Sequence, residues 1–205
     1  MTALANVKAL VFDVFGTVVD WRRSIIVEGE AFGRAKELDL DWAAFADDWR
    51  GGYQPSMDQV RRGDLPWTNI DALHRMTLVG LLKKYGVEGV SDAEIDHFNR
   101  AWHRLKPWPD AVEGLTSLRQ NYVLSTLSNG NVALLVNMAK KAGLPWDCVL
   151  SAELVRRYKP DPAVYACAAG LLGLAPSEVM MVAAHNGDLM AAKDVGLRTA
   201  FVARP

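Results

Sequence analysis

The chain has 205 residues, half of them hydrophobic, which is enough for one large domain or for a core domain that carries a smaller insert. Lys and Arg number 23 against 24 Asp and Glu, so the net charge of −1 argues against the one-signed surface that is typical of nucleic-acid-binding proteins. No apolar stretch reaches the roughly 18 residues of a membrane span.

The N-terminus and the cysteines predict a compartment. The first ten residues, "MTALANVKAL", lack the charged-then-apolar layout of a secretory signal. Cys148 and Cys167 are the only cysteines, which does not suggest a disulfide framework. We therefore expect a soluble, cytoplasmic protein without a membrane partner.

The first predicted strand is the run "VKALVFDV", residues 7–14, and Asp13 lies near its end. Phe15, Gly16 and Thr17 follow directly. Loop chemistry alone can explain this exit, because Asp, Gly and Thr all suit the passage from a strand to a loop. Residues 13–17 alone therefore do not show whether Asp13 has a function, and other segments of the chain are needed.

Residues 21–106 show amphipathic helical patterns and no convincing strand. Most of the seven Trp residues fall in this segment or at its edges, where core or interface packing explains them. Its histidines, His74, His97 and His103, have no metal-ligand partners in the sequence pattern and are interpreted as ordinary helix residues. Because one strand precedes the segment and the other strands follow it, we expect a helical cap over the carboxyl ends of the strands.

Beyond residue 106, predicted strands and helices alternate. The strands, interpreted as buried, are 122–129, 148–154, 179–185 and 198–203, and the helices are 111–120, 131–142, 161–172 and 187–195. Gly143, Gly173 and Gly196 stand where helix C-caps are needed, and Pro162 stands near a helix start. The pattern predicts an α/β fold: a Rossmann-like parallel-sheet core domain (1–20 and 107–205) with an inserted helical cap domain (21–106).

Polar side chains lie at or just beyond the ends of four of the predicted strands. They are Asp13 with Thr17, Ser128 with Asn129, Lys159, and Asp188. Each has an ordinary explanation alone: "YKPDP", for example, is a turn before a helix, and its lysine would lie on the surface. Parallel strands bring their carboxyl ends to one edge, however, and Lys and Asp are rarely buried there unless paired. The set together indicates a functional site.

In their order along the chain, these segments resemble the haloacid dehalogenase superfamily. The pieces "FDVFGTVVD", "LSNGN", "YKPDPAVY" and the cap segment "DWRGGY" are most similar to the L-2-haloacid dehalogenases of type II. The resemblance covers the whole chain. It implies hydrolysis of short L-2-haloalkanoic acids to 2-hydroxy acids, with small 2-haloacids and halide as ligands, no cofactor or metal, and a homodimer.

The resemblance also implies roles for the strand-end residues. Asp13 would attack C2 of the substrate and form an aspartyl ester, with inversion at C2. Lys159 would supply the cation that an ionised Asp13 needs, and Asp188 would hold Lys159 in place. Ser128 and Thr17 would anchor the substrate carboxylate and orient Asp13.

Arg50 of the cap and Asn129 of the core resemble the pair that holds the departing halide. Without the resemblance, Arg50 would be interpreted as a solvated helix charge that covers Trp49. The other residues expected to bind substrate or halide are Val14, Phe15, Tyr165 and Asn186.

Phe15 distinguishes this sequence from the phosphatases of the superfamily, which carry a second Asp there to protonate the leaving alcohol. Phenylalanine cannot give a proton, and a halide needs none. Phosphatases also usually carry an acidic metal ligand where this chain has Ala184, so magnesium would lack part of its oxygen shell. Both positions favour carbon–halogen chemistry.

His185 is a departure from the resemblance, because many relatives have an asparagine in this motif. A neutral imidazole could hold or activate the hydrolytic water in its place, although a lone histidine at a strand end is also explained as structural. Two other functions stay open: a magnesium-dependent small-molecule phosphatase whose acid has moved, and a non-catalytic member that binds a small acid or a protein.

Overall fold

The computed structural model describes residues 6–205. Residues 1–5, part of the N-terminal stretch expected to carry no secretory signal, lie outside the described residues. The chain divides into two compact units: Trp21–Lys106 forms one, and the residues up to Asp20 together with Pro107–Pro205 form the other. We call them the helical unit and the core unit.

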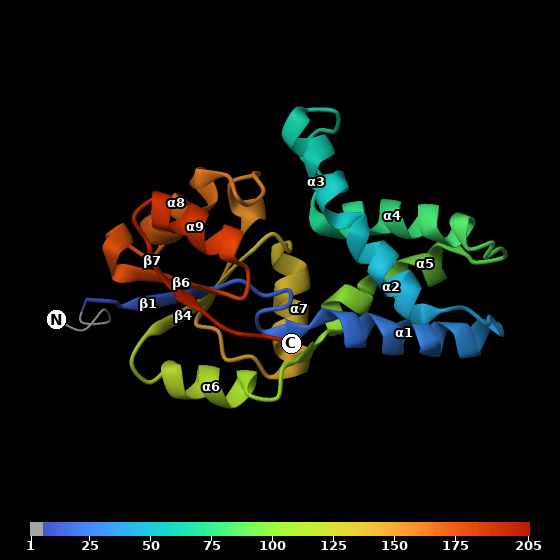
Figure 1. The fold of residues 1–205 in the computed structure, drawn as a ribbon, viewed down its shortest axis with the longest axis horizontal. Helices are drawn as coiled ribbons and strands as arrows, with labels where there is room; N and C mark the ends of the chain where they lie inside the picture. The colour runs from blue at the N-terminus through green and yellow to red at the C-terminus, as the bar shows by residue number, and fades with distance from the viewer. Residues whose placement is uncertain (1–5) are drawn as a thin grey trace. The chain divides into compact units, whose positions relative to one another are not determined.

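The core unit is built on a five-stranded parallel sheet (Figure 1). Its strands, in spatial order, are β5 (Cys148–Ser151), β4 (Val123–Ser128), β1 (Ala9–Phe12), β6 (Val179–Ala183) and β7 (Arg198–Phe201). All four residues of the central strand β1 are buried, as expected for a strand with a neighbour on each side and helices on both faces. The sheet confirms the predicted α/β fold class.

Helices cover both faces of this sheet, and α6 lies on the opposite face from α8 and α9 in Figure 1. The helical elements of the core unit are α6 (Ala111–Leu118), α7 (Val132–Ala142), α8 (Pro162–Leu171) and α9 (Asn186–Asp194), with short 3₁₀ turns at Ala152–Leu154 and Pro176–Glu178. Pro162 opens α8, and Gly143 ends α7 with φ of 69°, a left-handed conformation that suits glycine.

Two details of the strand predictions were wrong. The last strand is largely exposed rather than buried, because β7 is an edge strand that pairs only with β6. The third predicted strand, 148–154, ends early at Ser151. Its hydroxyl accepts a hydrogen bond from the Glu153 N–H at 3.0 Å, which turns the chain into a 3₁₀ turn instead of extending the strand.

The helical unit packs around an aromatic core. Its helices are α1 (Trp21–Lys36), α2 (Trp42–Gly51), α3 (Tyr53–Arg62), α4 (Ile70–Lys84) and α5 (Asp92–Asn99), followed by a 3₁₀ turn at Arg100–Arg104. Trp49 and Trp102 are fully buried and meet edge to face at 5.5 Å. Trp42 packs over α1, where a Cβ at Gly29 would lie 2.5 Å from its ring, so this position requires glycine.

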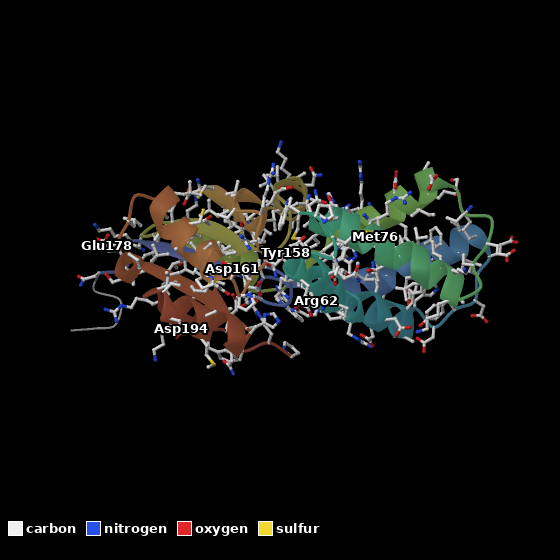
Figure 2. The ribbon with its side chains drawn as sticks, turned by 90° about the horizontal axis from the view of Figure 1, so that it is seen from above. Arg62, Met76, Tyr158, Asp161, Glu178 and Asp194 are labelled. Carbon is white, nitrogen blue, oxygen red and sulfur yellow. The ribbon has the colours of Figure 1, made fainter. Side chains whose placement is uncertain are left out.

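Two short strands, β2 (Val19–Asp20) and β3 (Lys106–Pro107), form a separate two-stranded sheet. Within residues 6–205, no helix combines the length and the apolar character needed to cross a membrane. Figure 2 shows Met76 of α4 on the surface, in agreement with its exposed fraction of 52 %.

Candidate active site

Asp13 follows the central strand β1 and is held by the backbone on both sides. Its N–H donates to the Val182 carbonyl of β6 at 3.0 Å. The loop behind it is a tight turn, in which the N–H groups of Thr17 and Val18 donate to the Val14 carbonyl. Gly16 adopts φ of 84° in this turn, a conformation that side chains other than glycine rarely adopt. The sequence "DVFGT" thus fixes the Asp13 carboxylate at the end of the sheet.

Three side chains from three segments meet the Asp13 carboxylate, which is only 9 % exposed. The Thr17 hydroxyl donates to Oδ2 at 2.7 Å, and His185 Nδ1 lies 3.0 Å from the same oxygen. Lys159 Nζ lies 3.5 Å from the other oxygen, Oδ1. The two carboxylate oxygens therefore have different surroundings.

Lys159 is buried, and its ammonium lies closer to Asp188 than to Asp13. Nζ donates to Asp188 Oδ2 at 2.7 Å, while the Tyr165 hydroxyl donates to Asp188 Oδ1 at 2.6 Å. Both oxygens of Asp188 are thus engaged, and the carboxylate fixes the position of the lysine. Figure 2 labels Tyr158 and Asp161, which flank this lysine in the turn before α8.

Asp13 stays ionised although it is buried. Burial alone would raise its pKa, but the Lys159 ammonium, the His185 ring and the Thr17 hydroxyl together lower the pKa to about 2. The carboxylate is therefore charged across the neutral pH range, as a nucleophile must be. This also explains why the lysine can be buried, since its charge is paired twice.

The end of β4 contributes Ser128, and the loop after it contributes Asn129. The Asn129 side-chain oxygen accepts from the Lys159 N–H at 2.8 Å, so its amide NH₂ is the end of the side chain that can bind an anion. The buried Ser128 hydroxyl accepts from the Gly130 N–H at 3.1 Å, which shapes the loop. Its own proton can be donated elsewhere.

The remaining predicted residues have different environments. Val14 and Phe15 are nearly inaccessible, at 1 % and 2 % exposure, and a Cβ at Gly130 would lie 3.2 Å from the Phe15 ring. Asn186 opens α9 and is exposed. Arg50 belongs to the helical unit, where its guanidinium lies 4.0 Å from the centre of the Tyr53 ring. The structure thus joins Asp13, Thr17, Lys159, Tyr165, His185 and Asp188 in one network.

A second group of residues supports the loop 13–18, which carries Asp13, and was missed by the sequence analysis. Arg204 Nε donates to the Thr17 carbonyl at 2.8 Å, and its NH1 donates to Asp110 at 2.7 Å. The Trp108 indole N–H donates to the Gly16 carbonyl at 3.2 Å. Backbone carbonyls occur at every residue, so no sequence pattern marks such contacts. Trp108 was assigned to packing, and Arg204 was not considered.

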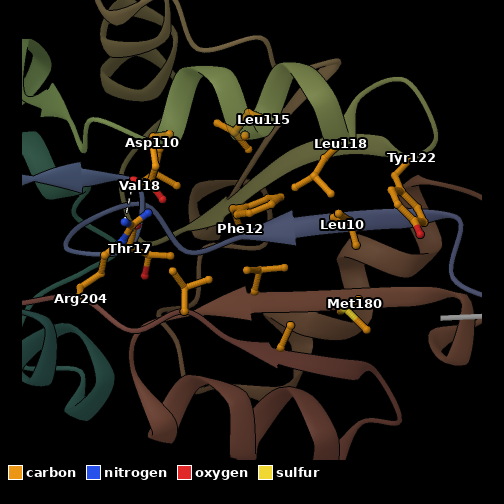
Figure 3. A pocket seen from close by; sticks show the side chains of 15 residues that line it. Leu10, Phe12, Thr17, Val18, Asp110, Leu115, Leu118, Tyr122, Met180 and Arg204 are labelled. Atoms are coloured by element: carbon orange, nitrogen blue, oxygen red, sulfur yellow. Dashed lines mark hydrogen bonds and ion pairs between the residues drawn. The ribbon is translucent and has the colours of Figure 1, made fainter. Parts of the chain in front are cut away.

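Thr17, Asp110 and Arg204 lie together at one end of an apolar cavity of about 280 Å³ (Figure 3). The cavity lies between α6 and the sheet, and its apolar lining includes Phe12 and Leu115. The polar contacts at this end of the cavity belong to the support of the loop 13–18.

The network offers one cation and two carboxylates but little for a metal. Among residues 6–205, no group of three or more His, Cys, Asp or Glu side chains is placed to hold a metal ion. Both carboxylates, Asp13 and Asp188, already contact Lys159. What the arrangement can do is present a charged carboxylate oxygen to an electrophile and then support attack on the resulting ester.

The chain resembles known proteins in sequence and in fold. The family profile of the haloacid dehalogenase-like hydrolases matches residues 7–196. The crystal structure of a defluorinating L-2-haloacid dehalogenase is 47 % identical, covers 100 % of this chain and 84 % of its own, and superposes with a TM-score of 0.96. The (S)-2-haloacid dehalogenase 4A of Burkholderia cepacia is 29 % identical over 97 % of this chain and 84 % of its own length.

A third similar protein was solved with a bound acid. The L-2-haloacid dehalogenase of Xanthobacter autotrophicus, solved with chloropropionic acid covalently bound, is 29 % identical, covers 97 % of this chain and 78 % of its own, and has a TM-score of 0.85. That protein therefore forms a covalent bond to a three-carbon acid.

Proposed function

Because the chain belongs to the haloacid dehalogenase-like hydrolases, we propose that it hydrolyses the carbon–halogen bond of short L-2-haloalkanoic acids and releases 2-hydroxy acids. The observation that carries this proposal is the buried yet ionised Asp13 beside Lys159. A carboxylate held charged at the end of a parallel sheet is a nucleophile in the place where such sheets bind ligands. The names of similar proteins support the carbon–halogen bond as its target.

In the first step, the Asp13 carboxylate attacks C2 from the side opposite the halogen. A bond forms between the aspartate oxygen and C2, and the carbon–halogen bond breaks with its electron pair leaving on the halide. The product is an aspartyl ester with inverted configuration at C2. Covalently bound chloropropionic acid in the Xanthobacter autotrophicus relative supports a covalent intermediate here.

In the second step, water attacks the ester carbonyl of Asp13, and the ester bond breaks to release the 2-hydroxy acid. The configuration at C2 does not change, so the overall reaction inverts it. Asp13 returns to a carboxylate, and a proton is released. Asp188 holds Lys159 at 2.7 Å throughout, so the cation stays beside the reacting carboxylate.

The leaving group needs no acid in this proposal. Phe15, two residues after Asp13, has no proton to give, and a halide leaves as an anion without one. We assign the halide to Arg50 and to the amide of Asn129, because charged and amide donors stabilise developing negative charge. Ser128 and Thr17 serve the substrate carboxylate and the orientation of Asp13.

The acyl chain of the substrate is assigned to the other predicted residues. They are Val14, Phe15, Tyr165 and Asn186. Haloacetates belong to the proposed substrates, because their C2 carries no side chain that would obstruct attack. We also propose that the enzyme works in the cytoplasm, without a metal and as a homodimer. The exposed Val27, Met76 and Val79 of the helical unit offer apolar surface for self-association, which sedimentation analysis would test.

The decisive experiment measures halide released from each enantiomer of 2-chloropropionate in the presence of a metal chelator. We expect chloride and D-lactate from the L enantiomer and very little chloride from the D enantiomer. A small phosphoester with magnesium is tested in parallel. Phosphate release from it, with no chloride from either enantiomer, would overturn the proposal in favour of a phosphatase.

A further inference from the structure

The two oxygens of Asp13 are not equivalent, and the difference assigns them separate tasks. Oδ2 accepts from the Thr17 hydroxyl at 2.7 Å and faces His185 Nδ1 at 3.0 Å. Oδ1 faces Lys159 Nζ at 3.5 Å, beyond a normal hydrogen-bond length. Oδ1 is therefore the oxygen with the weaker directional contacts and the more available lone pairs.

The direction of the Thr17 hydrogen bond follows from its other contact. The Ala184 N–H donates to Thr17 Oγ1 at 3.0 Å, and an amide N–H can only donate. The hydroxyl proton of Thr17 is thereby directed to Asp13 Oδ2. The residue after Ala184 is His185, so one short segment supports both contacts to this oxygen.

The tautomer of His185 follows in the same way. An ionised carboxylate can only accept hydrogen bonds, so a nitrogen 3.0 Å from Oδ2 carries the proton. The backbone fixes this residue at the start of α9, because the His185 carbonyl accepts from the Asp188 N–H at 3.1 Å. Nδ1 is therefore a donor toward Asp13, and this nitrogen cannot also take a proton from water.

We propose that Asp13 attacks through Oδ1, and that Thr17 and His185 then hold Oδ2 as it becomes the oxyanion of ester hydrolysis. This inference rests on the proposed function and assigns His185 a catalytic role as a donor. The role differs from the water-activating one that the sequence suggests for His185.

The balance of the hydrolytic step places the charge on Oδ2. The water oxygen bonds to Cγ of Asp13, and the carbonyl electron pair moves onto Oδ2. When the pair returns, the bond between Cγ and Oδ1 breaks, and Oδ1 leaves as the hydroxyl oxygen of the product. One proton of the water ends on that hydroxyl, and the other goes to solvent as Asp13 ionises again.

Donors on Oδ2 act differently in the two steps. During attack on C2, negative charge leaves the carboxylate for the halide, so these hydrogen bonds do not help the transition state. During hydrolysis, negative charge returns to Oδ2, so the same hydrogen bonds become stronger there than in the neutral ester. Only interactions that are stronger in the transition state accelerate a step. Loss of a donor therefore slows hydrolysis and spares ester formation.

The test uses rapid-quench kinetics of the whole chain with L-2-chloropropionate, measuring chloride and the mass of the Asp13 peptide. For His185→Ala we expect a burst of about one chloride per enzyme at an undiminished rate, then turnover slowed about 10²-fold. The aspartyl ester should accumulate in the quenched peptide. Thr17→Val should behave likewise, whereas Thr17→Ser should keep most of the turnover.

His185→Asn separates a donor from a base. An asparagine amide can donate but cannot take up a proton, so its turnover should stay within about tenfold of the wild type. His97→Ala, at an exposed histidine of α5, is the matched control and should change nothing.

Three outcomes would overturn the inference: unchanged turnover in His185→Ala, a slowed burst without ester, or an asparagine variant as slow as the alanine variant. Failure of the proposed function is distinguishable from these. In that case the wild-type enzyme itself releases no chloride and forms no ester.

Discussion

Asp13 of the core unit and His74 of the helical unit are both buried titratable side chains, but only Asp13 is charged at neutral pH. Asp13 is 9 % exposed and His74 is 2 % exposed, so burial disfavours the charged form of each. For Asp13, the Lys159 ammonium and the hydrogen bonds from His185 and Thr17 prevail and lower the pKa to about 2. For His74, burial prevails, the nearby Arg50 charge adds to it, and the pKa falls to about 3.

The difference lies in the neighbours. His74 stacks on Trp102 at 4.2 Å, and within residues 6–205 neither of its ring nitrogens has a hydrogen-bond partner. Asp13 has Thr17, His185 and Lys159 around it. A buried charge is costly unless it is paired. The polar contacts around Asp13 keep this carboxylate charged, whereas His74, without such contacts, stays neutral. The proposed chemistry therefore falls on Asp13.

The largest effect is expected from removing the charge of Asp13. Asp13→Asn keeps the shape of the side chain but loses the nucleophile, so halide release should fall by about 10⁴-fold or more. Steady-state chloride release from L-2-chloropropionate measures this. Asp47→Asn, at an exposed aspartate that pairs with Arg22, should retain activity. Equal activity of the two variants would remove Asp13 from the mechanism.

Removing the cation beside Asp13 should have the next largest effect. Lys159→Met removes the positive charge that lowers the pKa of Asp13 most. The pKa of Asp13 should therefore rise, and the rate of chloride release should fall about 10²-fold. The acid limb of the pH profile of kcat/KM should move to higher pH. Lys84→Met, which loses an exposed pair with Asp48, is the control. An unmoved acid limb would show that another group keeps Asp13 ionised.

In the helical unit, the expected effect is on the pH dependence of stability and not on activity. His74 binds a proton in the unfolded chain near pH 6.5 but in the folded chain only near pH 3. Protonation thus favours unfolding, and stability should be lost as the pH falls from about 6.5 toward 3. Between pH 7 and pH 4, the free energy of unfolding should decrease by roughly 2 kcal/mol less in His74→Phe than in the wild type, or by a still smaller amount. Urea unfolding at both pH values measures this difference. An identical loss in both proteins would show that His74 is not neutral when folded.

Losing the support behind the loop 13–18 should have the smallest effect on activity. Arg204→Met loses the hydrogen bond to the Thr17 carbonyl and the pair with Asp110. We expect kcat to fall about tenfold through misplacement of Asp13 and Thr17, with a small decrease in Tm. Arg119→Met, which loses an exposed pair with Asp147, should lower neither. If kcat were the same in both variants, the loop would not depend on Arg204.

Much of the core fold was predictable, because short apolar runs between glycine and proline signals are typical of parallel strands. The bounds of α3 were not predicted, although the helical pattern of residues 21–106 covers it. Only Gly52 separates Tyr53–Arg62 from α2, so the sequence does not mark where one helix ends and the next begins. The exposure of β7 depends on its place at the sheet edge, which is a property of topology and not of the run "RTAFVA".

Part of the candidate site was likewise predictable from the sequence, and part was not. Asp13, Lys159 and Asp188 were recognisable as a set, because the carboxyl ends of parallel strands meet at one edge and the segments resemble a known family. The contact of His185 with Oδ2 depends on the direction of its ring, which the sequence does not specify. Arg204 and Trp108 bind backbone carbonyls, so their partners have no signature in side-chain identity.

In the proposed mechanism, an oxygen of Asp13 enters the product. A single turnover in H₂¹⁸O, with enzyme in excess over L-2-chloropropionate, tests this by mass spectrometry of both lactate and the Asp13 peptide. We expect unlabelled lactate and an ¹⁸O atom in Asp13, because water attacks the ester and not C2. Labelled lactate from that first turnover, with an unlabelled Asp13, would contradict it.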